Sequence, residues 1–510
     1  MNTLYFGDNL EVMREMDDQR VDLICTDPPF NSGRDYNAFL TDSLAQSKAF
    51  TDTWTWDDPA KDSRADIERR ARTSDTYKAL DTCLKGYDLV LQNAVSGNKG
   101  SMRAYLAFMG PRLAEMHRIL KDTGSIYLHC DPTASHYLKG VMDALWDHSN
   151  HKKNEHFRNE IVWHYRRWTA GNKDFQRMHD TILRYAKSSN FNFNVQFEPY
   201  GDWIKKDYSH VDEEGRRWRW HTVKGKRYKV YLEDEDRGVK LNDVWQIPYL
   251  GSTAKERLGY PTQKPRSLYE RMIQASSNEG DLVMDPFAGC GTTIDAAHTL
   301  NRFWIGIDLT ILSLDPMRRR LADRHGLQPS IDYEIHGYPT NMQEVRMLVR
   351  DERKYHDFSN WAVTRLGLQP TKSVGDGGKD GEAEVGHITL WDPEAGETTN
   401  TRILAEVKSG KPTISQVRAF CRVMDKHDAI GVFITIEPVS AGMRQEAADM
   451  GTFLHNNETF PRLQFWQIDD TYFANPSSLR SLIRLPQQWL EPMRKMERHF
   501  TDTQMTLLRS

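Results

Sequence analysis

The sequence lacks any run suited to crossing a membrane. None of its apolar stretches approaches the roughly 20 residues that a bilayer requires, and Met1-Asn2-Thr3-Leu4-Tyr5 has no signal-peptide pattern. These absences exclude a membrane protein and predict a cytoplasmic location. At 510 residues the chain is too long for one ordinary hydrophobic core, so we expect about two to four domains.

Cysteine is scarce, and so is net charge. The five cysteines, at positions 25, 83, 130, 290 and 421, show no Cys-x-x-Cys or Cys/His ligand spacing, which argues against a disulfide framework and a zinc site. The net charge of −4 does not by itself indicate a nucleic-acid partner.

The basic residues are nevertheless segregated. Between residues 150 and 230 they alternate with aromatic residues in three clusters, at 166–168, 216–220 and 224–229. Such clusters suit phosphate contact and base stacking. Taken alone, they are equally well explained as a solvated surface over packed aromatic rings.

Two polar loops follow two short apolar runs. Residues 21–25 precede Asp27-Pro28-Pro29-Phe30, and residues 281–284 precede Asp285-Pro286-Phe287-Ala288-Gly289-Cys290-Gly291-Thr292-Thr293. Both runs have the length and composition of buried strands. Both loops are therefore expected at the carboxyl ends of strands, where open α/β sheets bind ligands.

The two loops resemble the signatures of the amino-group DNA methyltransferases, which methylate an exocyclic base nitrogen with S-adenosylmethionine. The catalytic signature (D/N/S)PP(Y/F) is matched by residues 27–30, and the cofactor signature FxGxG by residues 287–291. Because the catalytic loop comes first, the chain resembles the circularly permuted β class. The resemblance covers about residues 1 to 330 and includes two further blocks, at 6–10 and 260–265.

The resemblance implies a binding site for S-adenosylmethionine. Gly289 and Gly291 would let the backbone approach the methionine end. Asp308, which ends the expected strand 302–308, would bind the ribose hydroxyls, and Asp8 would contact the adenine amino group. The other residues implied in cofactor binding are Asp285, Phe287, Thr292, Lys264 and Pro265.

The resemblance also implies how the target base is held. Asp27 and the carbonyl of Pro28 would accept hydrogen bonds from the amino group, stiffened by the prolines Pro28 and Pro29. Phe30 would stack on a base flipped out of the duplex. In the family, aspartate at the first loop position goes mostly with adenine N6 and serine mostly with cytosine N4, so we expect adenine while cytosine stays open.

The same comparison divides the chain. Residues 1–187 would form the catalytic part, 188–255 the target-recognition region and 256–340 the cofactor-binding part of one permuted Rossmann-like α/β sheet. We expect helices over 102–120 and 267–277, strands over 125–129, 159–163 and 179–187, and an irregular segment at 54–58. His129, His179 and Glu352 are expected to be structural residues.

A different unit begins near residue 345. Its expected order is a helix (358–366), a glycine-rich turn (375–381), two strands (387–391 and 402–408), a helix (415–424) and a strand (430–436). Over residues 345–510 this order resembles the α/β PD-(D/E)xK nuclease fold of Mrr-type restriction endonucleases.

The nuclease resemblance implies a second active site. Asp380 and Glu406 would hold Mg²⁺, Lys408 would orient the attacking water, and Gln416 occupies a frequent accessory position. The alternative is that Glu406 and Lys408 form an ordinary ion pair on one face of a strand. The unit would then be a noncatalytic module that binds DNA or a partner.

The sequence thus predicts a site-specific adenine-N6 DNA methyltransferase that acts on double-stranded DNA in a restriction–modification or phage-defence system. The expected cofactors are S-adenosylmethionine and, for the C-terminal unit, Mg²⁺. Partner subunits of such a system and a homodimer are left open. A less favoured alternative is methylation of RNA or protein, because related loops serve other planar amides and amines.

Overall fold

The structure is a computed structural model of the chain. It describes residues 2–30, 35–39, 46–51, 54–93, 99–147, 156–166, 175–201, 204–234, 238–251, 254, 256–258, 262–308, 311–329, 331–339, 341–350, 355–366, 368–370, 381–391, 398–455, 458–474, 479 and 483–485.

A nine-stranded sheet forms the centre of the larger unit, in the order β13-β6-β7-β5-β2-β14-β15-β1-β16. Neighbouring strands are parallel except that β7 runs antiparallel to β5 and β6. The strands are β1 (Asn2–Phe6), β2 (Val21–Thr26), β5 (Leu120–Cys130), β6 (Phe157–His164), β7 (His179–Ala186), β13 (Val244–Gln246), β14 (Leu282–Asp285), β15 (Phe303–Asp308) and β16 (Tyr333–His336). This sheet confirms the predicted α/β architecture.

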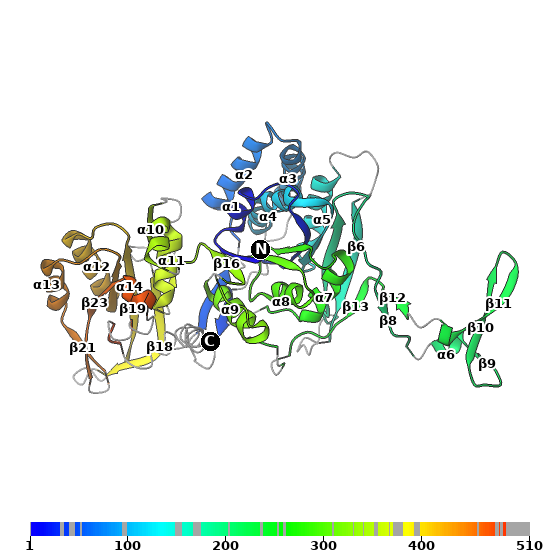
Figure 1. Ribbon diagram of the computed structural model, residues 1–510. Helices are drawn as coiled ribbons and strands as arrows, with labels where there is room; N and C mark the ends of the chain where they lie inside the picture. Colours follow the sequence, from blue (N-terminus) through cyan, green and yellow to red (C-terminus); the bar gives the residue numbers. More distant parts are fainter. Residues whose placement is uncertain are drawn as a thin grey trace.

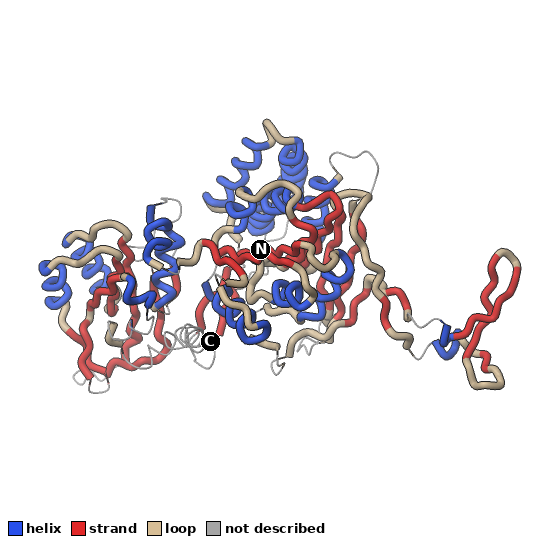
Figure 2. Tube along the Cα trace, viewed as in Figure 1, coloured by secondary structure: helices blue, strands red, loops and turns tan. Residues whose placement is uncertain are grey.

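Helices cover both faces of the sheet, as Figures 1 and 2 show. One face carries α1 (Asn9–Arg14), α2 (Asp58–Arg70), α3 (Asp75–Asn93), α4 (Lys99–Ile119) and α5 (Ser135–Trp146), and the other carries α7 (Arg266–Ser276), α8 (Thr292–Thr299) and α9 (Ile311–His325). A strand between two helical layers must be apolar on both sides. In β2, Ile24 packs into the core beneath α1–α5, whereas Leu23 and Cys25 pack into the opposite core.

The N-terminal strand β1 lies in the sheet between β15 and the edge strand β16. β1 pairs in parallel with β15, so that Leu4 lies opposite Gly306. A Cβ atom on Gly306 would meet Ile294 Cδ1 at 2.2 Å, so glycine lets α8 pack directly on β15. The N-terminal strand thus lies beside the strand that follows the cofactor loop, as a permuted sheet requires.

Two local features differ from the sequence expectation. The segment expected to be irregular at 54–58 is irregular over residues 54–57, but the helices α2 and α3 that follow it were not predicted; Asp57 caps α2, and apolar residues of α3 such as Leu80 and Leu84 are buried. Gly124 lies inside β5 instead of preceding it. A Cβ atom there would come within 2.8 Å of the Asp22 carbonyl, so glycine permits close approach to β2.

Part of the segment 188–255 projects from the central sheet, whereas β13 of the same segment belongs to that sheet. Figure 1 shows β10 (Arg217–Val223) and β11 (Lys226–Tyr231) as a hairpin that extends away from the central sheet. Its turn uses left-handed backbone at Lys224 (φ 47°) and Gly225 (φ 79°), as two-residue hairpin turns require. Short elements surround it: β8 (Phe197–Glu198), α6 (Ile204–Asp207), β9 (His210–Val211), a 3₁₀ turn (Leu232–Asp234) and β12 (Val239–Lys240).

The C-terminal unit has its own five-stranded sheet, in the order β17-β18-β19-β20-β23. Its strands are β17 (Gln369–Pro370), β18 (Gly381–Trp391), β19 (Thr398–Lys408), β20 (Ala429–Thr435) and β23 (Leu463–Gln467). Its helices are α10 (Met342–Arg350), α11 (Tyr355–Arg365), α12 (Ile414–Lys426), α13 (Ala441–Asp449) and α14 (Asp470–Ala474). The described elements α11, β18, β19, α12 and β20 follow the predicted order, with the short strand β17 added between α11 and β18; residues 375–380 of the predicted turn lie outside the described residues.

Two smaller two-stranded sheets complete the fold, β3 (Asp35–Phe39) with β4 (Gln46–Thr51) and β21 (Thr452–His455) with β22 (Glu458–Pro461). One buried cluster runs from the α7–α9 side of the large sheet through Phe358 and Trp361 of α11 to β19 and β20. The two units therefore share apolar contacts. Within the described ranges, no helix is long and apolar enough to span a membrane.

Candidate functional site

The two signature loops meet at one edge of the sheet. β2 and β14 are parallel neighbours, with Leu23 opposite Val283 and Ile24 opposite Met284. The loops that follow these strands therefore start side by side. In the catalytic loop, Pro28 is buried, whereas Asp27, Pro29 and Phe30 are partly accessible to solvent.

Two basic side chains contact the Asp27 carboxylate. Lys264 Nζ donates a hydrogen bond to Oδ2 at 2.5 Å, and His129 Nδ1 lies 2.9 Å from Oδ1. Burial alone would raise the pKa of Asp27, but Lys264 and His129 together lower it to about 2. Among the described residues, Oδ1 accepts no hydrogen bond of good geometry. The loop thus presents an ionised carboxylate with one acceptor oxygen still available.

His129 extends this contact into a buried row of charged groups. Its Nε2 lies 3.2 Å from Asp180 Oδ2, and the other Asp180 oxygen accepts a hydrogen bond from the Tyr165 hydroxyl at 3.2 Å. The Phe30 ring packs edge-on against the imidazole at 5.0 Å, and Lys264 Nζ lies 5.0 Å from the centre of the same ring. Phe30 is therefore held over the charged row.

The sequence interpretation missed this role for His129, which was expected to be structural. The contact could have been inferred from the strand order. Thr26 at the end of β2 lies opposite Leu128 of β5, so Asp27 and His129, the residues that follow them, must also be neighbours. Lys264 was assigned to the cofactor pocket, and the structure instead places its ammonium group on Asp27.

A second cluster ties the N-terminal block to the glycine loop. Arg112, buried in α4, donates to both oxygens of Asp8 at 2.8 and 2.7 Å and to Asn9 Oδ1 at 2.7 Å. Asn9 Nδ2 in turn donates to the Pro286 carbonyl at 2.6 Å. Arg112 was not singled out from the sequence, since a lone arginine in an amphipathic helix carries no distinctive pattern. It fixes the position of Asp8 relative to the loop.

The glycine loop leads directly into α8. Gly289 (φ 51°) and Gly291 (φ 74°) have left-handed backbone, which favours glycine at both positions. The Asp308 carboxylate accepts from the Gly289 amide at 2.8 Å and from the Ser313 hydroxyl at 2.5 Å. Asp308 therefore lies against the loop, at the end of the next strand, where it was expected.

Three further residues predicted to bind the cofactor, Asp285, Thr292 and Pro265, have structural contacts in or near the glycine loop. Asp285 accepts from the Phe287 amide at 3.0 Å and the Thr293 hydroxyl at 2.6 Å, and its burial raises its pKa to about 7. The Thr292 hydroxyl is buried and accepts from Arg320 at 3.0 Å. Pro265 is the N-cap of α7. Of the block 260–265, residues 260 and 261 lie outside the described residues.

Comparison with known proteins assigns the family. A model of the N6/N4 methyltransferases, described as DNA methylase, matches residues 21–312. The chain belongs to this DNA methylase family. Its activity is therefore DNA methylation with S-adenosylmethionine as the methyl donor, as the loop resemblance predicted. The matched segment ends before the C-terminal unit.

The chain is similar in sequence to named DNA methyltransferases. The type II methyltransferase M.HpaI of Haemophilus parainfluenzae is 26% identical over 336 residues, which are 66% of this chain and 79% of that protein. The DNA adenine methyltransferase YhdJ of Escherichia coli (strain K12) is 24% identical over 321 residues, 62% and 82% respectively. Among solved structures, the cytosine-N4-specific PvuII DNA methyltransferase is 15% identical, with a TM-score of 0.37 over 64% of this chain and 88% of that one.

The residues at the sheet edge fit S-adenosylmethionine. A Cβ atom on Gly7 would meet nothing within 4 Å, so open space lies beside the N-terminal block. Two carboxylates, Asp8 and Asp308, lie at the ends of β1 and β15, which are neighbours, and carboxylates suit ribose hydroxyls and an amino group. When bound, the cofactor supplies the methyl group, and these carboxylates would hold its ribose and amino groups.

The predicted nuclease residues are only partly brought together. Glu406 and Lys408 lie on one face of β19, 2.5 Å apart at Oε1 and Nζ. Gln416 uses its side-chain oxygen to accept from the Thr413 amide at 2.9 Å, closing a capping box at the start of α12. Asp380 lies outside the described residues. In the described part of the chain, no three His, Cys, Asp or Glu side chains gather as a metal site.

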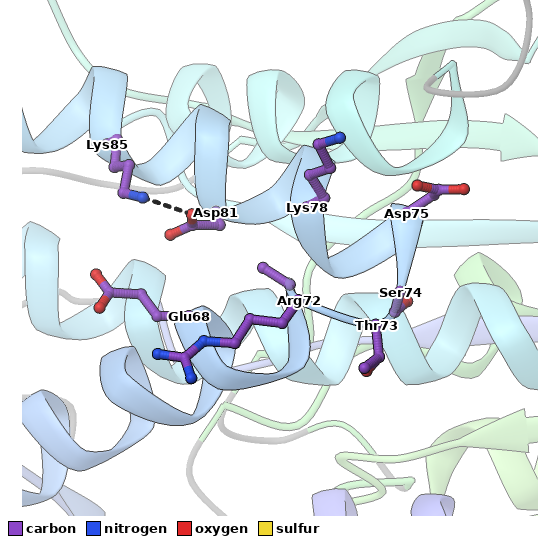
Figure 3. A pocket seen from close by; sticks show the side chains of 9 residues that line it. Glu68, Arg72, Thr73, Ser74, Asp75, Lys78, Asp81 and Lys85 are labelled. Carbon is purple, nitrogen blue, oxygen red and sulfur yellow. Dashed lines mark hydrogen bonds and ion pairs between the residues drawn. The ribbon is translucent and has the colours of Figure 1, made fainter.

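A separate groove lies between α2 and α3 (Figure 3). Its volume is about 470 Å³. Its charges are partly satisfied internally, since Lys85 Nζ contacts Asp81 at 2.7 Å. The lining residues are Glu68, Ala71, Arg72, Thr73, Ser74, Asp75, Lys78, Asp81 and Lys85, none of which belongs to the signature loops.

Proposed function

We propose that this methyltransferase modifies the exocyclic N6 of adenine at specific sites in double-stranded DNA, within a restriction–modification or phage-defence system. The observation that carries the proposal is the ionised Asp27 carboxylate, whose Oδ1 accepts no hydrogen bond of good geometry among the described residues and which lies beside the partly buried Phe30 ring. An amino group bound there would donate to Asp27 and to the Pro28 carbonyl. Both contacts draw the nitrogen lone pair out of conjugation as the methyl group is attacked.

A base can reach this carboxylate only after it leaves the helical stack. Flipping costs a few kcal/mol, and stacking on Phe30 offsets part of that cost because base–aromatic stacking contributes about 1–3 kcal/mol. The edge contact of Phe30 with His129 and the Lys264 ammonium group over the Phe30 ring keep the ring in place before the base arrives.

The choice of adenine rests on aspartate at position 27. The name of YhdJ, a DNA adenine methyltransferase, supports it, whereas the PvuII enzyme is named as cytosine-N4-specific. Assignment to a restriction–modification system is supported by M.HpaI, a type II methyltransferase, and by the StyLTI Mod subunit of a type III restriction–modification enzyme.

The segment 188–255, which contains the projecting hairpin β10–β11, is the proposed target-recognition region. In the hairpin, Lys229 Nζ lies 4.4 Å from the Trp218 ring centre, and Trp220 is about half exposed. Basic groups over aromatic rings suit contact with phosphates and bases. At the start of the hairpin, Arg216 pairs with Asp212 at 2.9 Å.

Transfer of tritiated methyl groups to duplex DNA tests the proposal. We expect duplex DNA to be labelled, RNA and protein not to be, and sequencing at base resolution to place the label on adenine N6 within one recurrent sequence. Asp27→Ala should abolish labelling while the affinity for S-adenosylmethionine stays near that of the wild type. Label on cytosine would contradict the base assignment, and an active Asp27→Ala protein would contradict the role of the carboxylate.

A second candidate activity is Mg²⁺-dependent cleavage of DNA by residues 345–510. It is favoured by the Glu406–Lys408 pair on β19 in a sheet whose element order resembles the PD-(D/E)xK nucleases. In this proposal Glu406 and Asp380 hold the ion, and Lys408 orients the attacking water. Gln416 contributes at most through its position, because its amide closes the helix cap.

Plasmid nicking distinguishes cleavage from a noncatalytic DNA- or partner-binding module. We expect nicking with Mg²⁺, none with EDTA, and none in Lys408→Ala, while methyl transfer is unaffected. The matched control is Lys411→Ala, which changes a nearby lysine outside β19. Nicking that survives in Lys408→Ala would contradict the assignment, and absence of nicking in the wild type would favour the noncatalytic module.

A further inference from the structure

The feature that the methyltransferase chemistry leaves unexplained is the buried row Lys264–Asp27–His129–Asp180. It joins four parts of the chain: the segment before α7, the loop after β2, the end of β5 and the start of β7. His129 is 3% exposed at its side chain, and the three partners are 10 to 16% exposed. Four ionisable groups at such burial are retained only when their charges compensate.

The geometry fixes the protonation state of His129. One ring nitrogen lies 2.9 Å from an oxygen of Asp27 and the other 3.2 Å from an oxygen of Asp180. A neutral imidazole has one N–H group and one lone pair, so in that state one lone pair would face a carboxylate. The doubly protonated ring faces both carboxylates with N–H groups. The row then contains two negative and two positive charges and is neutral.

We propose that His129 is a positioning residue for the methylation reaction, which as an imidazolium holds the Asp27 carboxylate in place and is itself oriented by Asp180. The inference rests on the proposed role of Asp27. His129 contacts Oδ1 at 2.9 Å and Lys264 donates to Oδ2, so each oxygen of the Asp27 carboxylate has one such partner and keeps a second lone pair for the target amine. Tyr165, through its hydroxyl bond to Asp180, and the Trp163 ring, 5.6 Å from His129, fix the far side of the imidazole.

The electrostatics agree with this assignment. Burial lowers the pKa of His129, and Lys264 also lowers it, but Asp27 and the hydrogen bond with Asp180 raise it above its usual value. A group whose pKa is raised on folding keeps its effect below the unfolded value, about 6.5, and loses it as the pH rises through the folded pKa. The rate of methylation should therefore fall at alkaline pH.

Variants of His129 test the proposal through the rate. Asparagine can place an amide nitrogen near the Nδ1 position, facing Asp27, and glutamine can place one near the Nε2 position, facing Asp180. Both remove the titratable charge. We expect kcat to fall on the order of tenfold to hundredfold, the effect of losing one charge-assisted hydrogen bond, with His129→Asn the more active of the two. KM for S-adenosylmethionine should stay within about twofold, and the alkaline decline of kcat should vanish in both.

Two further variants complete the design. Asp180→Asn should move the alkaline decline to lower pH, because the imidazolium loses one carboxylate. His179→Asn is the matched control, since His179 is exposed on the same strand next to Asp180, and it should retain the wild-type profile. The proposal is overturned if His129→Asn keeps the wild-type kcat and alkaline decline, if His129→Gln is the more active variant, or if only KM and thermal stability change.

A measurement without DNA separates this inference from the proposed function. In protein labelled with ¹⁵N-histidine, the nuclear magnetic resonance signals of His129, assigned by their loss in His129→Gln, should show both ring nitrogens protonated at neutral pH. They should titrate at lower pH in Asp180→Asn. A neutral His129 at pH 7 overturns the inference even in an active enzyme. Absence of methyl transfer by the wild type would instead contradict the proposed function and leave this readout decisive.

Discussion

Replacing Gly291 by alanine should weaken cofactor binding through a defined steric conflict. Left-handed backbone costs an L-residue roughly 1–2 kcal/mol. In addition, the new Cβ atom would lie 2.5 Å from Cγ and 3.3 Å from Cβ of Met317. These atoms are close to the backbone of α9, and Met317 is buried, so rotation of the side chain end cannot relieve the overlap. Overpacking of this kind costs about 1–3 kcal/mol.

Relief of the overlap requires the loop or the start of α8 to move, which displaces the backbone that the cofactor would approach. We expect the Kd for S-adenosylmethionine to rise at least about tenfold, equivalent to roughly 1.4 kcal/mol, with a lower melting temperature. Isothermal titration calorimetry and thermal melting measure the two effects.

The matched control is Gly280→Ala. Gly280 is also left-handed (φ 83°), but a Cβ atom there would meet nothing within 4 Å. It should therefore show the backbone cost alone, with an unchanged Kd. Equal melting temperatures and equal affinities for the two variants would refute the steric argument.

Three other substitutions probe the charged contacts. Arg112→Met should raise the Kd for S-adenosylmethionine about tenfold by calorimetry, because Asp8 loses a buried partner that contacts both of its oxygens; an unchanged Kd would contradict this. The pKa of Asp285 is raised to about 7, so the contribution of Asp285 to stability is complete below about pH 4 and is lost as the pH rises through 7. The melting temperature of Asp285→Asn should therefore not show this decline with pH. The same pH dependence of the melting temperature in wild type and variant would contradict the prediction. In Lys264→Met, burial of Asp27 is opposed by His129 alone, so the pKa of Asp27 should rise from about 2. The loss of methylation on acidification should then begin at a higher pH than in the wild type, and coincident pH profiles would contradict this reasoning.

The sequence predicted those parts of the site whose residues lie close together along the chain. Residues 27–30 and 287–291 could be assigned because each loop follows a short apolar strand, and strand ends are where α/β sheets bind ligands. The helices α2 and α3 were missed because polar residues dominate α2, and its burial against α4 is a tertiary property. The hairpin β10–β11 was missed although Lys224-Gly225 between two alternating runs is a turn pattern.

By itself, the sequence determined the family, the order of its loops and the carboxylate that begins the catalytic loop, since these depend on residue type and short spacing. Tertiary structure decided which side chains surround that carboxylate. Lys264 lies 237 positions from Asp27 along the chain, and His129 reaches it only because β2 and β5 are neighbours in the sheet. Contacts of such separation follow from strand order and close packing, which no local pattern encodes, and they set the protonation state on which the chemistry of Asp27 depends.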